Sequence, residues 1–174
     1  MKISTTPSVV IRIVLWLFLI VGGAIYSISK DLNSSYFNSI SFHIITFILG
    51  VILMRFAFRA AAAGGKELAK KGREGNLPRL ETNKLVTTGI YSCTRHPMLF
   101  GLTLIPISIA LILGSPTFIT IVAPLEMIFI ILMVLTMEEK ECKIKYGDEY
   151  IKYSQKVPLF PKTKECFKKL FLKS

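Results

Sequence analysis

The chain is poor in the residues that hold metals or cross-link small domains. It has 3 cysteines and 2 histidines in 174 residues. Cys93 and His96 could be two metal ligands, but Cys142 and Cys166 lack the paired spacing that would complete a zinc site. We therefore expect no metal site. The odd cysteine count, on what is predicted below to be the cytoplasmic side, also argues against a disulfide framework.

Acidic residues are scarce as well, since 11 Asp and Glu stand against 22 Lys and Arg and leave a net charge of +11. An excess of this size can indicate nucleic-acid binding. Here the positive charge gathers in residues 59–96 and from Glu138 onward. The connections at 29–37 and 114–116 contain a single positively charged residue, Lys30. Because positive charge concentrates in cytoplasmic loops, the distribution indicates membrane topology and no nucleic-acid partner. The same charge would attract anionic membrane lipids.

Internal repeats and low-complexity tracts are also missing. Apolar residues make up 52% of the chain and come in blocks, with a mean hydropathy of +0.54. A membrane-spanning helix needs about 20 mostly apolar residues. Four segments qualify, the third of them near the lower limit: about 9–28, 40–58, 98–113 and 117–137. The sequence predicts an all-α integral membrane bundle of four spans, or five if the loop or the tail re-enters.

The predicted topology divides the chain into three parts of a single domain. Residues 1–58 would be an N-terminal transmembrane hairpin, residues 59–96 a basic loop, and residues 97–174 a second hairpin with a tail. The first segment has no clear signal-peptidase site, so we expect an uncleaved anchor. With the N-terminus inside, residues 1–8, 59–96 and 138–174 lie on the cytoplasmic side.

The second hairpin brings two charged motifs to one membrane face. Pro97 suits the first turn of a helix, and Gly114-Ser115-Pro116 is a tight turn between two apolar segments. The segments on either side of this turn are therefore antiparallel. Arg95-His96 and Glu138-Glu139 should then lie at the same height, although some forty residues separate them in the sequence.

The segment after Glu139 should be a polar helix followed by a lid. Gly147 is a suitable residue to end that helix. Val157-Pro158 would be extended and could fold back over the site. Residues 163–174 mix Lys with Phe and Leu, which is typical of an amphipathic tail in the membrane interface.

The two motifs carry complementary charges. Arg95 offers a forked donor for a carboxylate, and Glu138 and Glu139 can accept from an ammonium group or from ribose hydroxyls. S-adenosylmethionine contains all of these groups, so the cluster is compatible with that cofactor. From the residues alone, charges that simply anchor helix ends at the interface are the alternative.

The motifs also resemble those of the isoprenylcysteine carboxyl methyltransferase and phospholipid methyltransferase superfamily. Its pattern G-x-Y-x-x-x-R-H-P-x-Y-x-G corresponds to residues 89–101 (GIYSCTRHPMLFG), and E-E-x-x-L-x-x-x-F-G-x-E-Y-x-x-Y to residues 138–153 (EEKECKIKYGDEYIKY). A V-P segment follows at residues 157–158. Leu99 replaces the usual Tyr, Cys142 the usual Leu and Lys156 the common Arg.

The resemblance implies an integral membrane enzyme that uses S-adenosylmethionine in a cytoplasmic pocket, formed by the loop before the third span and by the C-terminal tail. Glu138 and Glu139 would hold the ribose or the amino group, and the tail would cover the adenosine. His96 would contact the cofactor, with a role as a base as the alternative. The implied cofactor-binding set is Tyr91, Arg95, His96, Pro97, Leu99, Gly101, Glu138, Glu139, Tyr150, Tyr153, Val157 and Pro158.

The predicted reaction is methyl transfer to a lipophilic acceptor that arrives from the bilayer, with the carboxylate of a prenylcysteine-like molecule favoured. N-methylation of a phospholipid, S-methylation of a thiol and a non-catalytic lipid-binding scaffold are the alternatives. Besides Arg95, the catalytic candidates are Glu126, Arg55 and Arg59. Glu126 would line a substrate tunnel or be a protonated group bonded to a neighbouring helix. Arg55 and Arg59 would orient an anionic acceptor or extend to the interface.

Overall fold

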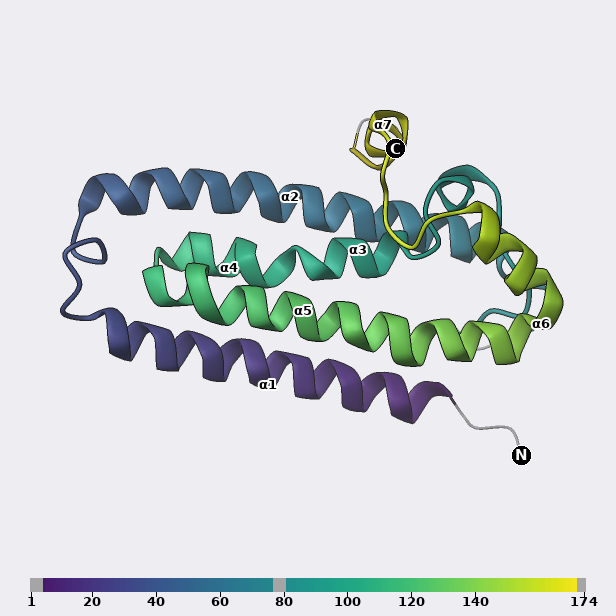
Figure 1. Ribbon diagram of the computed structural model, residues 1–174, viewed down its shortest axis with the longest axis horizontal. Coiled ribbons are helices and arrows are strands. Elements are labelled where there is room, and N and C mark those ends of the chain that lie inside the picture. Colours follow the sequence, from purple (N-terminus) through teal and green to yellow (C-terminus); the bar gives the residue numbers. More distant parts are fainter. Residues whose placement is uncertain (1–4, 77–80, 172–174) are drawn as a thin grey trace. The chain divides into compact units, whose positions relative to one another are not determined.

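The computed structural model describes residues 5–76 and 81–171, with side chains from residue 14 onward. The start of the predicted 1–8 segment, positions 77–80 of the basic loop and the end of the 163–174 tail lie outside the described residues. The described part is helical and has no strand. Its elements, shown in Figure 1, are α1 (Thr5–Asp31), α2 (Ile40–Lys71), η1 (Gly89–Ser92), α3 (Pro97–Thr103), α4 (Ile105–Leu113), η2 (Phe118–Val122), α5 (Ala123–Met133), η3 (Val134–Glu138), α6 (Glu139–Lys156) and α7 (Lys164–Phe171).

Three helices are long and apolar enough to cross a membrane: Val14–Asp31, Ile40–Lys71 and Phe118–Lys156. Pro97–Leu113 is a shorter apolar segment. The predicted all-α membrane fold is thus confirmed, with three spans of full length and a shorter fourth segment. About 20 residues cross the hydrocarbon core, so counting from Phe118 ends the apolar part of the last span at Met137.

The predicted third span is two short helices rather than one. α3 ends at Thr103 and α4 begins at Ile105. Proline has no backbone N–H and its ring clashes with the preceding turn. Pro106 therefore cannot donate to the carbonyl of Leu102, and the helix is interrupted at Leu104. The predicted third span thus occupies Pro97–Leu113, with a break at Leu104 between α3 and α4.

The chain forms two compact units, the first of which comprises Met1–Met54 and Ile105–Phe129. Its end is organised by the Asp31 carboxylate at the C-terminus of α1. This carboxylate accepts hydrogen bonds from the hydroxyls of Ser115 and Thr117 and from the Thr117 backbone N–H. Gly114 adopts a φ of 62° in the tight turn between α4 and η2. Asp31 thus fixes the turn that the sequence predicted there.

Small residues allow the helices of this first unit to approach closely, as is usual in membranes. A Cβ on Gly23 of α1 would lie 2.7 Å from Val122 Cγ1 and 2.9 Å from Glu126 Oε1. A Cβ on Gly50 of α2 would lie 2.7 Å from the backbone nitrogen of Ile112. A larger side chain at Gly50 would therefore force the helices apart, whereas one at Gly23 would have to displace the side chains of Val122 and Glu126.

The second unit comprises Arg55–Leu104 and Ile130–Ser174. Here α2 continues through Gly64-Gly65 to Lys71, well into the segment predicted as a loop. Its small residues pack against α3: a Cβ on Gly101 would lie 2.5 Å from the carbonyl oxygen of Ala57 and 2.7 Å from the nitrogen of Ala61. Gly64 is similarly close to Pro97 and Met98. The start of α3 is therefore held directly on α2.

The tail helix α7 packs into a cluster on the same unit. Cys166 and Leu170 are buried with Ala60, Val86, Ile90 and Tyr91, while Lys168 and Lys169 are exposed. Phe171 contacts Phe56 with ring centroids 5.0 Å apart. A disulfide joins Cys166 to Cys93, directly after η1.

The expectation of free thiols is therefore wrong for two of the three cysteines, and only Cys142 is free. Packing of α7 beside η1 places the two Cα atoms 5.7 Å apart, within the range that a disulfide requires. Sequence spacing could not reveal this, because 73 residues separate the two. Cytosolic thiols are usually kept reduced, so the disulfide argues against the predicted cytoplasmic placement, which stays a prediction.

Candidate functional site

The two charged motifs meet inside the second unit. Thr94-Arg95-His96 lies between η1 and α3, with His96 capping α3 and Pro97 in its first turn. Glu139 begins α6, two residues beyond the apolar part of the last span. The predicted meeting of Arg95-His96 with Glu139 is thus present in the structure, and it takes the form of direct hydrogen bonds.

Arg95 makes hydrogen bonds within the protein from all three nitrogens of its guanidinium. Nε donates to Glu139 Oε1 at 3.1 Å and Nη2 donates to Oε2 at 3.0 Å, which is the bidentate geometry of strong arginine–carboxylate pairs. Nη1 donates to the carbonyl oxygens of Ser154 and Val157 at 2.6 and 2.7 Å. Arg95 therefore joins the start of α6 to the end of the same helix.

Glu139 receives two further hydrogen bonds. His96 Nε2 lies 2.6 Å from Glu139 Oε1, and the Tyr150 hydroxyl donates to the same oxygen at 2.6 Å. A carboxylate only accepts, so His96 carries a proton on Nε2. With the two bonds from Arg95, the carboxylate accepts four hydrogen bonds, three of them at Oε1 and one at Oε2. It is 7% exposed and Tyr150 is 2% exposed, so the cluster is shielded from water.

The tail is attached to the motif through its backbone. The N–H groups of Arg95 and His96 donate to the carbonyl oxygens of Pro158 and Leu159 at 3.0 and 3.3 Å. The buried Thr94 hydroxyl also donates to Leu159 at 2.9 Å. Sequence reasoning missed Thr94, although its place directly before Arg95-His96 was a usable signal. The Val157-Pro158 segment therefore lies on the motif, as expected for a lid.

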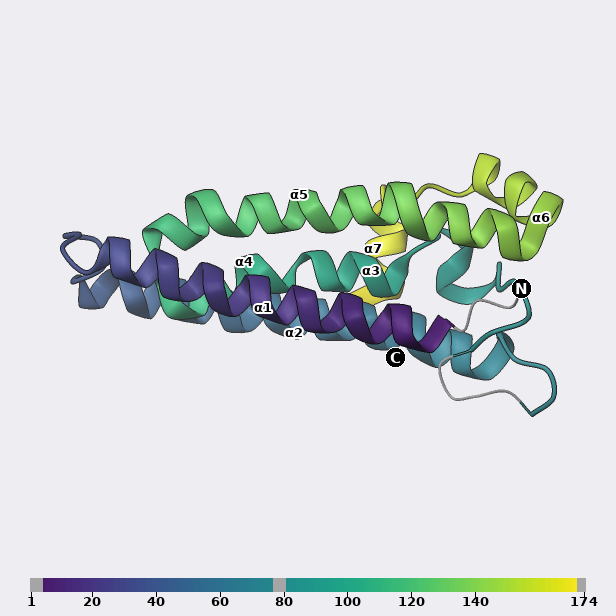
Figure 2. The same cartoon turned by 90° about the horizontal axis from the view of Figure 1, so that it is seen from below.

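Gly147 makes this return of the tail possible. It has φ 56° and ψ −135° inside α6, a conformation that strongly favours glycine. The chain reverses there, as Figure 2 shows, and Tyr150 and Tyr153 come back toward Glu139 and η1. The predicted helix end at Gly147 corresponds to this break.

Gly147→Ala is expected to lower the free energy of unfolding by about 1–3 kcal/mol. A Cβ at Gly147 would meet no atom within 4 Å, so the cost is backbone strain alone. Gly22→Ala is the matched control, because Gly22 has equally open space within α1; it should be neutral or stabilising by up to about 1 kcal/mol. Thermal unfolding in detergent measures both, and equal effects would contradict the proposed role of the Gly147 conformation.

Acid should weaken the cluster. Burial alone would raise the pKa of Glu139, but the hydrogen bonds from His96 and Tyr150 and the charge of Arg95 lower it from 4.5 to about 2. A lowered pKa stabilises the folded state fully above pH 4.5, and this contribution is lost as the pH falls toward 2. Between pH 5.5 and 2.5 the unfolding midpoint of the wild type should fall more steeply than that of Glu139→Gln. The exposed pair of Glu74 and Lys84 provides the control: Glu74→Gln should follow the wild type.

The remaining aromatic candidates lie beside the cluster. The Tyr153 hydroxyl donates to the carbonyl oxygen of Tyr91 at 2.6 Å, and Tyr91 donates to that of Gly64 at 3.4 Å. Both rings are buried. Leu99 and Glu138 are half-buried. The predicted cofactor residues of the second unit are thus gathered around one end of α3 and α6.

Among the described residues, the other catalytic candidates have no hydrogen bond or ion pair with this cluster. Glu126 belongs to the first unit, where it is buried against Gly23. Arg55 and Arg59 lie on the face of α2 opposite to Ala57 and Ala61, which contact Gly101, because successive residues turn by 100°. Their predicted role in catalysis stays a prediction.

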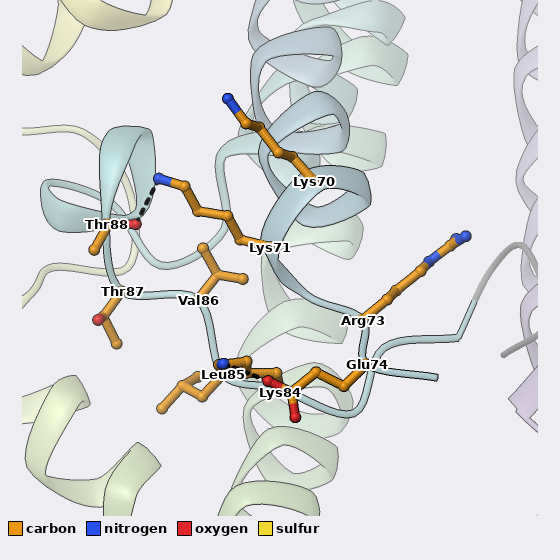
Figure 3. A pocket seen from close by; sticks show the side chains of 9 residues that line it. All are labelled: Lys70, Lys71, Arg73, Glu74, Lys84, Leu85, Val86, Thr87 and Thr88. Atoms are coloured by element: carbon orange, nitrogen blue, oxygen red, sulfur yellow. Dashed lines mark hydrogen bonds and ion pairs between the residues drawn. The ribbon is translucent and has the colours of Figure 1, made fainter. Parts of the chain in front are cut away.

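A cavity of about 490 Å³ lies in the basic loop of the same unit (Figure 3) and is lined by Lys70, Lys71, Arg73, Glu74, Lys84, Leu85, Val86, Thr87 and Thr88. Its cations do not converge on one point. Lys71 donates to Glu67 and to Thr88, Lys84 pairs with Glu74, and the Arg73 side chain points away from Thr88. The cavity therefore offers no obvious reactive centre. Within the part of the chain that the structure describes, no three His, Cys, Asp or Glu side chains could hold a metal ion.

The model of the phospholipid methyltransferase family matches residues 45–149, which contain both Arg95-His96 and Glu138-Glu139. The chain therefore belongs to the phospholipid methyltransferase family of membrane proteins. It is also 30% identical over 118 residues to protein-S-isoprenylcysteine O-methyltransferase B of Arabidopsis thaliana. That match covers 68% of this chain and 56% of the relative, so the chain spans little more than half of the relative's length. No solved structure matches.

Proposed function

We propose that the protein is a membrane methyltransferase that uses S-adenosylmethionine and methylates a lipophilic acceptor. The observation that supports this most directly is the buried cluster of Arg95, His96, Glu139 and Tyr150, which fixes the chain segment of the family motif at the end of a membrane span. S-adenosylmethionine supplies a methyl group that its sulfonium already activates. The protein then needs only to bind the cofactor and the acceptor, to orient them and to keep water out. A preorganised site contributes these three things.

The residues present fit this cofactor by their chemistry. Glu139 is buried and bonded to Arg95, His96 and Tyr150, so we assign it the positioning of the motif. We assign the ammonium group or the ribose hydroxyls to Glu138, the half-buried carboxylate beside it in the same motif. The aromatic rings of Tyr91 and Tyr153 and the Val157-Pro158 segment are the proposed wall for the adenosine.

The favoured acceptor is the carboxylate of a prenylcysteine-like molecule, as the name of the Arabidopsis relative suggests. A carboxylate is already nucleophilic when ionised and needs no strong base. Methylation of a phospholipid amine is the second candidate, because the matching family is named for that activity. A prenylcysteine analogue and an aminophospholipid, each offered with methyl-labelled cofactor, separate the two: base releases the label from a methyl ester as methanol and leaves an N-methyl group intact.

Binding of S-adenosylhomocysteine to the detergent-purified protein tests the cofactor assignment by calorimetry. Glu138→Gln should weaken binding by about tenfold or more, the usual range for one charged hydrogen bond, in a sample that circular dichroism shows to be folded. Glu149→Gln is the matched control, since Glu149 is an exposed carboxylate of α6, and it should bind like the wild type. Absence of binding in a folded wild-type sample would reject the cofactor proposal and favour a lipid-binding scaffold.

A further inference from the structure

A groove on the far side of α2 from the motif carries two arginines. Its volume is about 470 Å³, and it is lined by Arg55, Phe58, Arg59 and Ala62. Arg55 and Arg59 are one turn apart, so their side chains are neighbours on the helix surface. The Phe58 side chain is 60% exposed, whereas Ala57 is fully buried. The groove therefore belongs to the outward face of the second unit.

Among the described residues, no carboxylate forms an ion pair with either of the two guanidinium groups. Within residues 14–76 and 81–171, the structure gives neither Arg55 nor Arg59 an ion pair or a hydrogen bond, in contrast to Arg95 and Lys71. Two unpaired forked cations four residues apart present donors that suit the oxygens of a phosphate or a carboxylate.

The position of the groove along α2 points to a lipid. The apolar part of this span ends close to Phe58, whose own apolar side chain is largely exposed. An exposed apolar surface on a spanning helix faces acyl chains, and arginines at its end lie at the level of the headgroups. A lipid seated there could place its acyl chains along the apolar part and its phosphate on the two arginines.

We propose that Arg55, Phe58, Arg59 and Ala62 form a binding site for the phosphate of an anionic membrane phospholipid. This lipid is a bound partner rather than the methyl acceptor, because the groove faces away from the α2 surface that contacts α3 and the motif. The proposal does not depend on the methyltransferase activity. Lipid binding, rather than extension of the arginine side chains to the membrane interface, is then the reason for two arginines at this place.

Native mass spectrometry of the full chain in detergent, with added phosphatidylglycerol or phosphatidylcholine, tests the proposal. The double substitution Arg55→Gln/Arg59→Gln should weaken phosphatidylglycerol binding by about 25-fold, about fivefold for each arginine, and leave phosphatidylcholine binding nearly unchanged. The matched control is Lys66→Gln/Lys70→Gln, which removes two exposed charges with the same spacing from the same helix. This control variant should keep most of its affinity for phosphatidylglycerol.

Three results would overturn the proposal. An equal loss in both double variants would mean that only net charge matters, and no loss in either would mean that the arginines merely extend to water. A loss of methyl transfer to the prenylcysteine analogue, with phosphatidylglycerol binding intact, would assign the arginines to the acceptor instead. Thermal unfolding of the same samples shows that each variant is folded, and binding of S-adenosylhomocysteine reports separately on the proposed function.

Discussion

Arg95→Ala is expected to lower the free energy of unfolding by about 3–5 kcal/mol, because it removes one partner of a buried ion pair. Glu139 would keep only His96 and Tyr150 as donors, and the carbonyl oxygens of Ser154 and Val157 would lose theirs. Urea unfolding in detergent, followed by circular dichroism, measures the loss. Binding of S-adenosylhomocysteine should fall with it, because the segment that carries the motif is no longer held.

Arg95→Lys separates charge from geometry. A lysine restores the positive charge but cannot reproduce the fork or reach both carbonyl oxygens at once, so an intermediate loss is expected. In a double-mutant cycle, Arg95→Ala combined with Glu139→Ala should cost clearly less than the sum of the single substitutions. Additive effects would show that the two side chains do not stabilise the fold as a pair.

The second large effect concerns the disulfide. Cys166→Ser should lower the free energy of unfolding by about 4 kcal/mol, the chain-entropy value for opening a loop of 73 residues. α7 should then separate from the Ala60 and Tyr91 cluster more readily, which limited proteolysis of the tail would detect. Cys142→Ser is the matched control, because Cys142 is half-buried and free, and its effect should be small.

Reducing agent offers an independent check on the same bond. It should reproduce the effect of Cys166→Ser in the wild type and have no further effect on the variant. Equal stability of the wild type with and without reductant, with both thiols shown to be free after reduction, would mean that packing of Leu170 and Phe171 alone fixes the tail.

The sequence allowed the meeting of the two motifs to be predicted because a tight turn leaves few choices. Gly114-Ser115-Pro116 forces the flanking helices to be antiparallel, and Arg95-His96 and Glu139 then lie at one end. What the sequence did not reveal is how completely Arg95 and Glu139 satisfy each other. That depends on the reversal at Gly147, which supplies Tyr150 and the carbonyl oxygens of the tail.

Other features depend on three-dimensional packing that no local pattern reports. The pairing of Cys93 with Cys166 follows from the place of α7 beside η1. Which face of α2 contacts α3 depends on the small residues Ala57 and Ala61. Arg55 and Arg59 lie at the same level along α2 but on its opposite face. The interruption at Leu104 was visible in principle, since Pro106 stands inside the apolar segment.

The carbonyl oxygens of Pro158 and Leu159 that hold the backbone of Arg95 and His96 also impose an order on biosynthesis. A nascent chain emerges from its N-terminus, and its early segments fold first. The spans can enter the bilayer while the ribosome is still translating the tail, but the motif has to wait some sixty residues for its partners. Maturation of the site is therefore a late, post-insertion event. A chain that stalled before Pro158 could sit in the membrane with its helices formed and its motif still open to water.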